Sequence, residues 1–127
     1  MKYLCLAYYD EAVFDSMSPA ELEALGKECA PHDEALRRTG QLFAVASLQH
    51  RAAVTVRSRS GKISTTDGPF VESKEQVGSA FIVEARDLDD AVRVASLHPA
   101  ARIGEHLGWA IEVRPIEMFD LPPPPRP

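Results

Sequence analysis

The stretch Thr66-Asp67-Gly68-Pro69-Phe70-Val71-Glu72-Ser73-Lys74-Glu75 separates two strand-like segments, and the rest of the chain is organised around it. Gly68 can adopt positive φ, while Pro69 fixes its own φ and disfavours a helical conformation at Gly68. The Asp67 carboxylate can accept a hydrogen bond from the backbone two residues on and close a turn. We expect Phe70 to be a buried anchor beside the charged groups that follow. This composition is typical of a pocket rim, and a tight, solvated connector is the alternative.

The composition fits one soluble domain and excludes several classes of protein. With 127 residues, 45% hydrophobic and 26% charged, the chain is long enough to bury a core. The net charge of −5, with no run of Lys or Arg, argues against nucleic-acid binding. No apolar run approaches the roughly 20 residues of a membrane span, and no signal peptide begins the chain. A cytoplasmic location is therefore expected.

Metal and cofactor sites are not expected either. Cys5 and Cys29 fall among apolar neighbours and are predicted to be buried free thiols. The four histidines lack the spacing of metal ligands, and the chain has no nucleotide-binding glycine loop.

Hydrophobic periodicity and turn residues predict six strands and two helices. Ser18-Pro19-Ala20-Glu21 is a capping box that begins the first helix, and Gly40 ends it. Pro31 predicts a kink in that helix or the start of a second one. The second helix begins at the capping residue Asp87. The expected strands cover residues 2–9, 41–49, 53–58, 62–66, 77–85 and 109–118, and residues 10–17 are expected to form a loop.

The positions of several helical residues bear on function. His32 follows Cys29 by three residues and precedes Leu36 by four, which places it on the inward face, with Asp33 on another face. The buried face of the second helix is predicted to consist of Leu88, Ala91, Val92 and Ala95. His98 is expected in its last turn, as a cation favoured by the helix dipole.

The order of these elements predicts a ferredoxin-like α+β fold. Residues 53–66 form a β-hairpin about Ser60-Gly61, and without this insertion the order is βαββαβ. Two helices cover only one face of such a sheet. The other face carries apolar side chains, and a second copy packed sheet against sheet is the simplest way to cover it. The chain is therefore expected to be a homodimer.

The signature stretch also carries a resemblance to a known family. Asp67-Gly68-Pro69-Phe70, followed by Glu72, Lys74 and Glu75, resembles the DGPF motif of the YCII-related (YciI-like) family. The segments 1–4 and 112–116 are similar to that family too, so the resemblance covers residues 1–119 and leaves a proline-rich tail over 120–127. It implies a dimeric α/β barrel.

The resemblance also implies a site. In YciI-like proteins a His on the first helix, followed by a Leu and a Gly, is proposed to pair with an Asp, and His32, Leu36 and Gly40 match that run. His32 is thus the expected acid–base group, and Asp67 is the carboxylate chosen to orient it. From the residues alone, a core histidine is the alternative. The expected ligand-binding residues are Tyr8, Gly68, Pro69, Phe70, Glu72 and Lys74, with Tyr9 as a further aromatic candidate.

Two classes of function follow as expectations. Relatives that include a dehydrochlorinase, and the similarly shaped muconolactone isomerases, imply a lyase or isomerase that acts on a small cyclic or phenolic compound. Other relatives are encoded beside alternative sigma factors or fused to them, which implies a non-catalytic dimeric module that binds a partner. A ligand carrier with aromatic walls is a third possibility.

Overall fold

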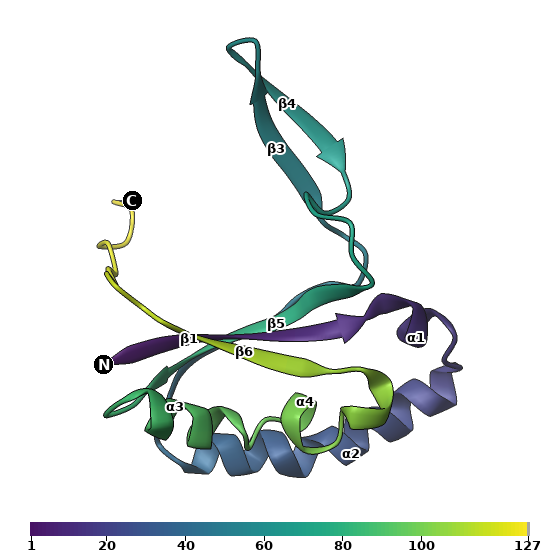
Figure 1. Ribbon diagram of the computed structural model, residues 1–127, viewed down its shortest axis with the longest axis vertical. Coiled ribbons are helices and arrows are strands. Elements are labelled where there is room, and N and C mark those ends of the chain that lie inside the picture. Colours follow the sequence, from purple (N-terminus) through teal and green to yellow (C-terminus); the bar gives the residue numbers. More distant parts are fainter. Residues whose placement is uncertain (127) are drawn as a thin grey trace.

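A computed structural model describes residues 1–126 and shows two layers (Figure 1). One layer is an antiparallel sheet with the strand order β2-β5-β1-β6. Its strands are β1 (Lys2–Asp10), β2 (Leu42–Ser47), β5 (Glu75–Glu84) and β6 (Ala110–Pro115). The other layer contains α2 (Pro19–Arg38), α3 (Leu88–Ala95), α4 (Pro99–Arg102) and the short 3₁₀ helix η1 (Glu105–Leu107). This order is that of a ferredoxin-like fold, as predicted, and within residues 1–126 the sheet is open rather than a closed barrel.

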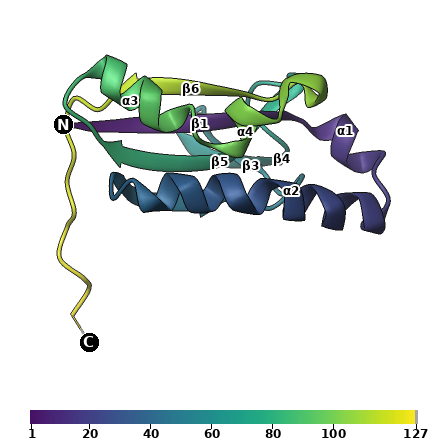
Figure 2. The same cartoon turned by 90° about the horizontal axis from the view of Figure 1, so that it is seen from below.

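The helices cover one face of the sheet and leave the other bare (Figures 1 and 2). Alternate residues of β1 and β5 point toward the helices, and Phe81 and Val83 are at most 1% exposed there. Their neighbours point the other way. Leu4 lies opposite Ile82, and Leu6 lies opposite Ala80. These apolar side chains of the bare face are only half-buried.

The first long helix begins and ends where its sequence predicts. The Ser18 side chain accepts from the Glu21 amide, and the Glu21 carboxylate accepts from the Ser18 amide, which completes the capping box. Gly40, just past the Thr39 cap, has a φ of +71°. The prediction of a second helix at Pro31 is wrong, because α2 runs through Pro31 as one helix.

Two local predictions also need correction. Residues 11–15 are a short helix, α1 (Glu11–Asp15), rather than a loop, because the buried Asp10 side chain accepts from the Ala12 amide and caps it. The buried face of α3 consists of Asp90, Ala91, Val94 and Ala95. Leu88 and Val92, which were expected to be buried, are 47% and 46% exposed. The helix is rotated because the Asp90 carboxylate finds its hydrogen-bond donors on the inner side.

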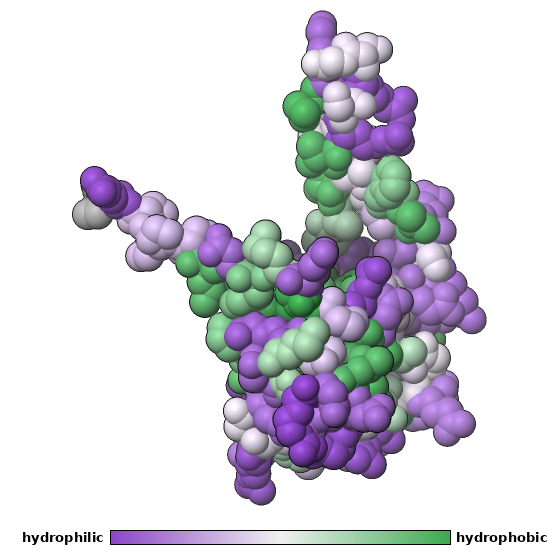
Figure 3. Space-filling view, turned by 60° about the vertical axis from the view of Figure 1, so that its left-hand side comes forward, coloured by the Kyte–Doolittle hydropathy of each residue, from purple (hydrophilic) through white to green (hydrophobic). Residues whose placement is uncertain are grey.

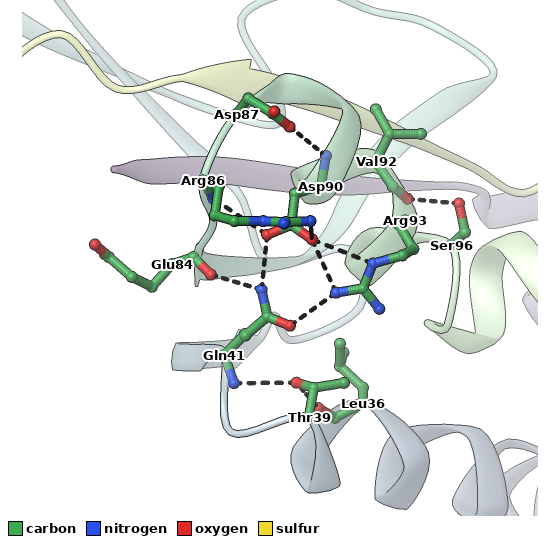
Figure 4. A network of polar contacts seen from close by, with 10 residues as sticks. All are labelled: Leu36, Thr39, Gln41, Glu84, Arg86, Asp87, Asp90, Val92, Arg93 and Ser96. Atoms are coloured by element: carbon green, nitrogen blue, oxygen red, sulfur yellow. Dashed lines mark hydrogen bonds and ion pairs between the residues drawn. The ribbon is translucent and has the colours of Figure 1, made fainter.

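That carboxylate is the centre of a polar network between α3 and the start of β2 (Figure 4). Asp90 accepts from the Arg86 amide at 3.1 Å, from Arg93 Nη2 at 2.8 Å and from Gln41 Nε2 at 3.1 Å. The Arg93 hydrogen bonds, followed by that of the Arg86 amide, lower the pKa of Asp90 to about 2. The network thus fixes α3 against the edge of the sheet.

Asp90→Asn should lower the melting temperature at neutral pH by several degrees, because it replaces a charged acceptor with donors facing the Arg86 amide and Arg93. The pKa of Asp90 is depressed on folding, so its contribution is complete above the unfolded value of 3.8 and is lost as the pH falls toward about 2. Thermal denaturation of both proteins from about pH 7 to about pH 3 should show the difference shrinking below about pH 4. A constant difference would show that the ionised carboxylate is not its cause.

A two-stranded hairpin, β3 (Val54–Arg59) and β4 (Lys62–Asp67), projects from the sheet on the side away from the helices (Figures 1 and 2). Ser60 and Gly61 both have positive φ, 52° and 78°, so the expected hairpin turn is confirmed. Val54, Val56 and Ile63 share one face of it and are 57%, 63% and 75% exposed. Figure 3 shows apolar side chains along the hairpin and at its base.

Candidate functional site

A cavity of about 650 Å³ lies between α2 and strands β2 and β5 on the helical side of the sheet. Residues of α2 at helical spacing form one wall, and the start of β5 forms another. The end of β1, the residues before α4 and Trp109 contribute the rest. A cavity of this size accommodates a small organic molecule.

Three aromatic rings give the cavity an apolar end. Tyr9 lies edge-on to Trp109, with centroids 4.8 Å apart, and Phe14 lies 5.7 Å from Tyr9 and 5.9 Å from Trp109. The Tyr9 ring also packs directly on Gly78, where a Cβ atom would collide with it. Gly78 thus allows the close approach of ring and strand that shapes this wall.

His98 enters the same cavity from the turn that precedes α4. Its side chain is buried, and its ring stacks on Phe81 with centroids 4.9 Å apart and planes 5° from parallel. His98 is the N-cap of α4, and its Nδ1 accepts from the Ala100 amide at 3.0 Å. Burial lowers the pKa of His98, and the nearby Asp33 carboxylate opposes this. The prediction of a dipole-stabilised cation is therefore wrong, because this ring caps a helix start in an apolar environment.

Asp33 lies on the α2 wall opposite. Its negative charge raises the pKa of His98 and adds to the effect of burial in raising the pKa of Tyr9 and Cys29. One carboxylate therefore acts on three groups of the same cavity. The expectation that Asp33 points to another face is corrected, since Leu22, Gly26, Cys29, Asp33 and Leu36 together line the cavity.

Two polar atoms in this region are buried without a protein partner. Within residues 1–126, Ser79 Oγ and Trp109 Nε1 have no hydrogen bond. Both residues belong to the cavity wall. Unsatisfied polar groups cost free energy, and a few polar groups in an apolar wall are how ligand sites achieve specificity.

Ion pairs hold one edge of the cavity. Asp15 of α1 accepts from His50 Nε2 at 2.7 Å and from Arg51 Nε at 2.9 Å. These hydrogen bonds, that of Arg51 first, lower the pKa of Asp15 to about 2. Arg51 has a backbone φ of 52°, which is unusual for a residue other than glycine. The segment that contributes His50 to the cavity is thereby tied to α1.

The residues predicted for the site are distributed over several places. His32 is half-buried on α2 but does not belong to the wall of this cavity, and Asp67 lies at the end of β4. Asp67, Gly68 and Pro69 line a second cavity of about 590 Å³ at the base of the hairpin. Neither described cavity contains both His32 and Asp67.

The other predicted ligand-binding residues lie outside the main cavity. Phe70 is 69% exposed with Arg57 over its ring, so the prediction of a buried anchor is wrong. The hairpin carries this residue away from the core. Tyr8 faces the bare side of the sheet, Glu72 is exposed, and Lys74 Nζ lies 3.7 Å from Asp10 Oδ2. Of the aromatic candidates, Tyr9 alone lines the main cavity.

The described part of the chain contains neither a metal-binding cluster nor a membrane-spanning helix. Residues 1–126 contain no cluster of three or more His, Cys, Asp or Glu side chains that could hold a metal ion. No helix in that range is both long and apolar enough to cross a membrane.

Comparison with known proteins identifies the family. The model of the YCII-related domain matches residues 1–119. The chain belongs to the YCII-related family. It is also 31% identical, over 120 residues and 94% of each chain, to a protein of Rhizobium meliloti (strain 1021) described as uncharacterized. The resemblance seen in the sequence is thus confirmed at the level of the family, which assigns no specific reaction.

The sequence also contains a signal that Asp33 faces the cavity. Asp33 follows Cys29 by four residues and precedes Leu36 by three, so it fits the inward helical spacing as well as His32 does. His98 gave a weaker signal, a His directly before a Pro that can begin a helix. Its burial depends on the packing of α4 beneath the sheet, which local sequence does not reveal.

Proposed function

We propose that this protein is an acid–base lyase or isomerase that acts on a small cyclic or phenolic compound in the cavity between α2 and the sheet. The observation that carries the proposal is that Asp33 and His98, from different elements, line one cavity that also has aromatic walls. Acid–base catalysis needs its ionisable and hydrogen-bonding groups within reach of one ligand. We assign the chemistry to them in place of His32 and Asp67.

The surroundings of the two groups support this role. Tyr9, Phe14 and Trp109 offer ring faces and edges to a flat ligand. Burial and the Asp33 charge perturb the pKa of His98 in opposite directions, and perturbed groups in a cavity are typical of functional sites. Among the described residues, the groups able to transfer a proton and the aromatic rings therefore line the same cavity.

A thermal-shift screen of small phenols, lactones and organic acids tests the proposal. At least one compound should raise the melting temperature of the wild type, and the shift should be largely lost in His98→Phe, which keeps a flat ring but no polar atoms. His32→Ala should keep the shift, because His32 is outside the wall. A compound whose stabilisation depends on His32 and not on His98 would contradict the assignment.

The bare face of the sheet favours a second property, a two-fold dimer. Leu4, Leu6 and Ile82 on this face are only half-buried, and exposed apolar sheet faces mark interfaces. The hairpin and the chain after β6 both extend on this side (Figure 1). Phe119, in the chain after β6, packs edge-on against Phe43 with ring centroids 5.3 Å apart. We infer that a second copy packs against the face, completing a dimeric α/β barrel. A partner-binding role, as a cytoplasmic accessory to a sigma factor, is the alternative function of such a dimer.

Light scattering at micromolar concentration should give twice the mass of the chain. Leu6→Asp should give a monomer, because it would place an unpaired charge in the interface. Val92→Asp, on the exposed side of α3, is the matched control and should stay dimeric. A monomeric wild type would exclude the sheet-to-sheet arrangement.

A further inference from the structure

We propose that His98 acts in this cavity as a neutral hydrogen-bond donor through Nε2–H, that Asp33 is the base, and that the substrate carries a carbonyl oxygen beside an acidic C–H bond. This inference rests on the proposed function of the same site. It differs from a general dyad, in which the imidazole itself takes up the proton.

The hydrogen bond to Ala100 determines which nitrogen carries the proton. A backbone amide can only donate, so Nδ1, which receives it at 3.0 Å, must present its lone pair. A neutral imidazole with Nδ1 as acceptor has its hydrogen on Nε2. The described residues offer Nε2 no acceptor, and His98 belongs to the cavity wall, so this N–H is available to a ligand.

Protonation of His98 is opposed by the same contact. A second hydrogen on Nδ1 would face the Ala100 N–H, two donors in opposition. Burial disfavours the cation as well. The other ionisable groups in the wall are Tyr9, Glu11, Cys29, Asp33, Arg37 and His50. Of these, the Asp33 charge favours the cation, and burial outweighs it.

A base must therefore come from elsewhere, and Asp33 is the carboxylate in the wall that acts electrostatically on His98. A neutral imidazole opposite a carboxylate is the arrangement that enolisation uses, with the imidazole polarising a carbonyl and the carboxylate removing the adjacent proton. The aromatic end, Tyr9 with Trp109, would hold the ring of a cyclic ketone or lactone.

The reaction balances without a further reagent. The Asp33 carboxylate takes the proton from the carbon beside the carbonyl. The electron pair of that C–H bond forms a C=C bond, and the carbonyl π pair moves onto oxygen, where His98 Nε2–H stabilises the negative charge. Where the substrate also has a C=C bond conjugated with the enolate, return of the proton from Asp33 to the far carbon of the resulting dienolate moves that C=C bond and gives an isomer. Departure of a β-substituent with its bonding pair gives an elimination product instead.

The donor state can be tested without a substrate. The full chain, uniformly labelled with ¹⁵N, should show in long-range proton–nitrogen correlation spectra that His98 is the neutral Nε2–H tautomer at neutral pH. A protonated His98 at neutral pH, or a proton on Nδ1, would overturn the inference.

The substrate class has its own test with cyclohex-2-enone as the carbonyl probe and cyclohexene as the matched hydrocarbon. The enone, and not cyclohexene, should shift the His98 Nε2–H resonance. In D₂O the wild type should accelerate hydrogen–deuterium exchange beside the carbonyl. His98→Gln, which retains an N–H near the position of Nε2, should lose less than about 10-fold of this rate, whereas His98→Phe should lose about 100-fold or more.

The outcomes separate the two levels of the proposal. Equal losses in His98→Gln and His98→Phe would overturn the donor role and leave an imidazole base within the proposed function. Absence of both the shift and the exchange at saturating enone would overturn the carbonyl class. The compounds found in the thermal-shift screen would then decide whether the site performs acid–base chemistry on another class of substrate.

Discussion

Asp33→Asn is expected to reduce turnover of the ligand identified by the screen by at least about 100-fold, the usual contribution of a positioned base. Asn has nearly the same shape but cannot accept the proton. The wall that it occupies should stay intact, because Asp33 is exposed on its helix and its side chain makes no hydrogen bond within residues 1–126. Steady-state kinetics, with circular dichroism to verify folding, make this measurement.

The matched control is the adjacent residue. His32→Ala changes the neighbouring position of α2, outside the cavity wall, and should leave turnover within a few-fold of wild type. The opposite pattern, with His32→Ala inactive and Asp33→Asn active, would restore the site predicted from the sequence. The pair of variants therefore distinguishes the two assignments directly.

Gly104→Ala is expected to lower the free energy of unfolding by about 1–3 kcal/mol or more, the usual cost of overpacking. A Cβ at this buried position would collide with Trp109 Cβ and lie 2.6 Å from the Ala100 carbonyl oxygen. The carbonyl is backbone, so α4 must move, and Ala100 is also the residue whose amide fixes His98. Urea denaturation should show the loss, and the same variant should weaken ligand binding.

Gly26→Ala is the matched substitution with the opposite expected sign. Gly26 lies within α2, and a Cβ there would meet nothing within 4 Å. Alanine should stabilise the helix by about 0.5–1 kcal/mol, because glycine loses more backbone entropy on folding. If both variants were equally destabilised, the close packing around Gly104 could not be the cause of its effect.

The fold could be predicted because local signals agreed with the final arrangement. The capping box at Ser18 and the positive φ values at Gly40 and Gly61 are properties of a few neighbouring residues. The order of strands and helices then leaves few topologies. The exposed Leu88 and the rotated face of α3 were beyond such reasoning, since burial of Asp90 depends partly on Gln41, 49 residues away in sequence.

The site was harder to predict, for physical reasons. His32 and Asp33 fit the helical spacing equally well, and which of them faces the cavity depends on how α2 packs against the sheet. Phe70 has the composition of a buried anchor, but it lies where the hairpin leaves the domain. His98 gains part of its role from stacking on Phe81, and that contact is not visible in its immediate sequence.

The hairpin has an evolutionary consequence. Its two strands pair with each other in a sheet of their own, and at its base the Gly68 amide donates to the Ala53 carbonyl at 2.8 Å. A segment that leaves and rejoins the domain at one point can be lengthened, shortened or exchanged between relatives while the four-stranded sheet keeps its register. The surface of the hairpin can thus change with the partner that it contacts. Asp33 and His98 are constrained separately, by the reaction proposed for the cavity.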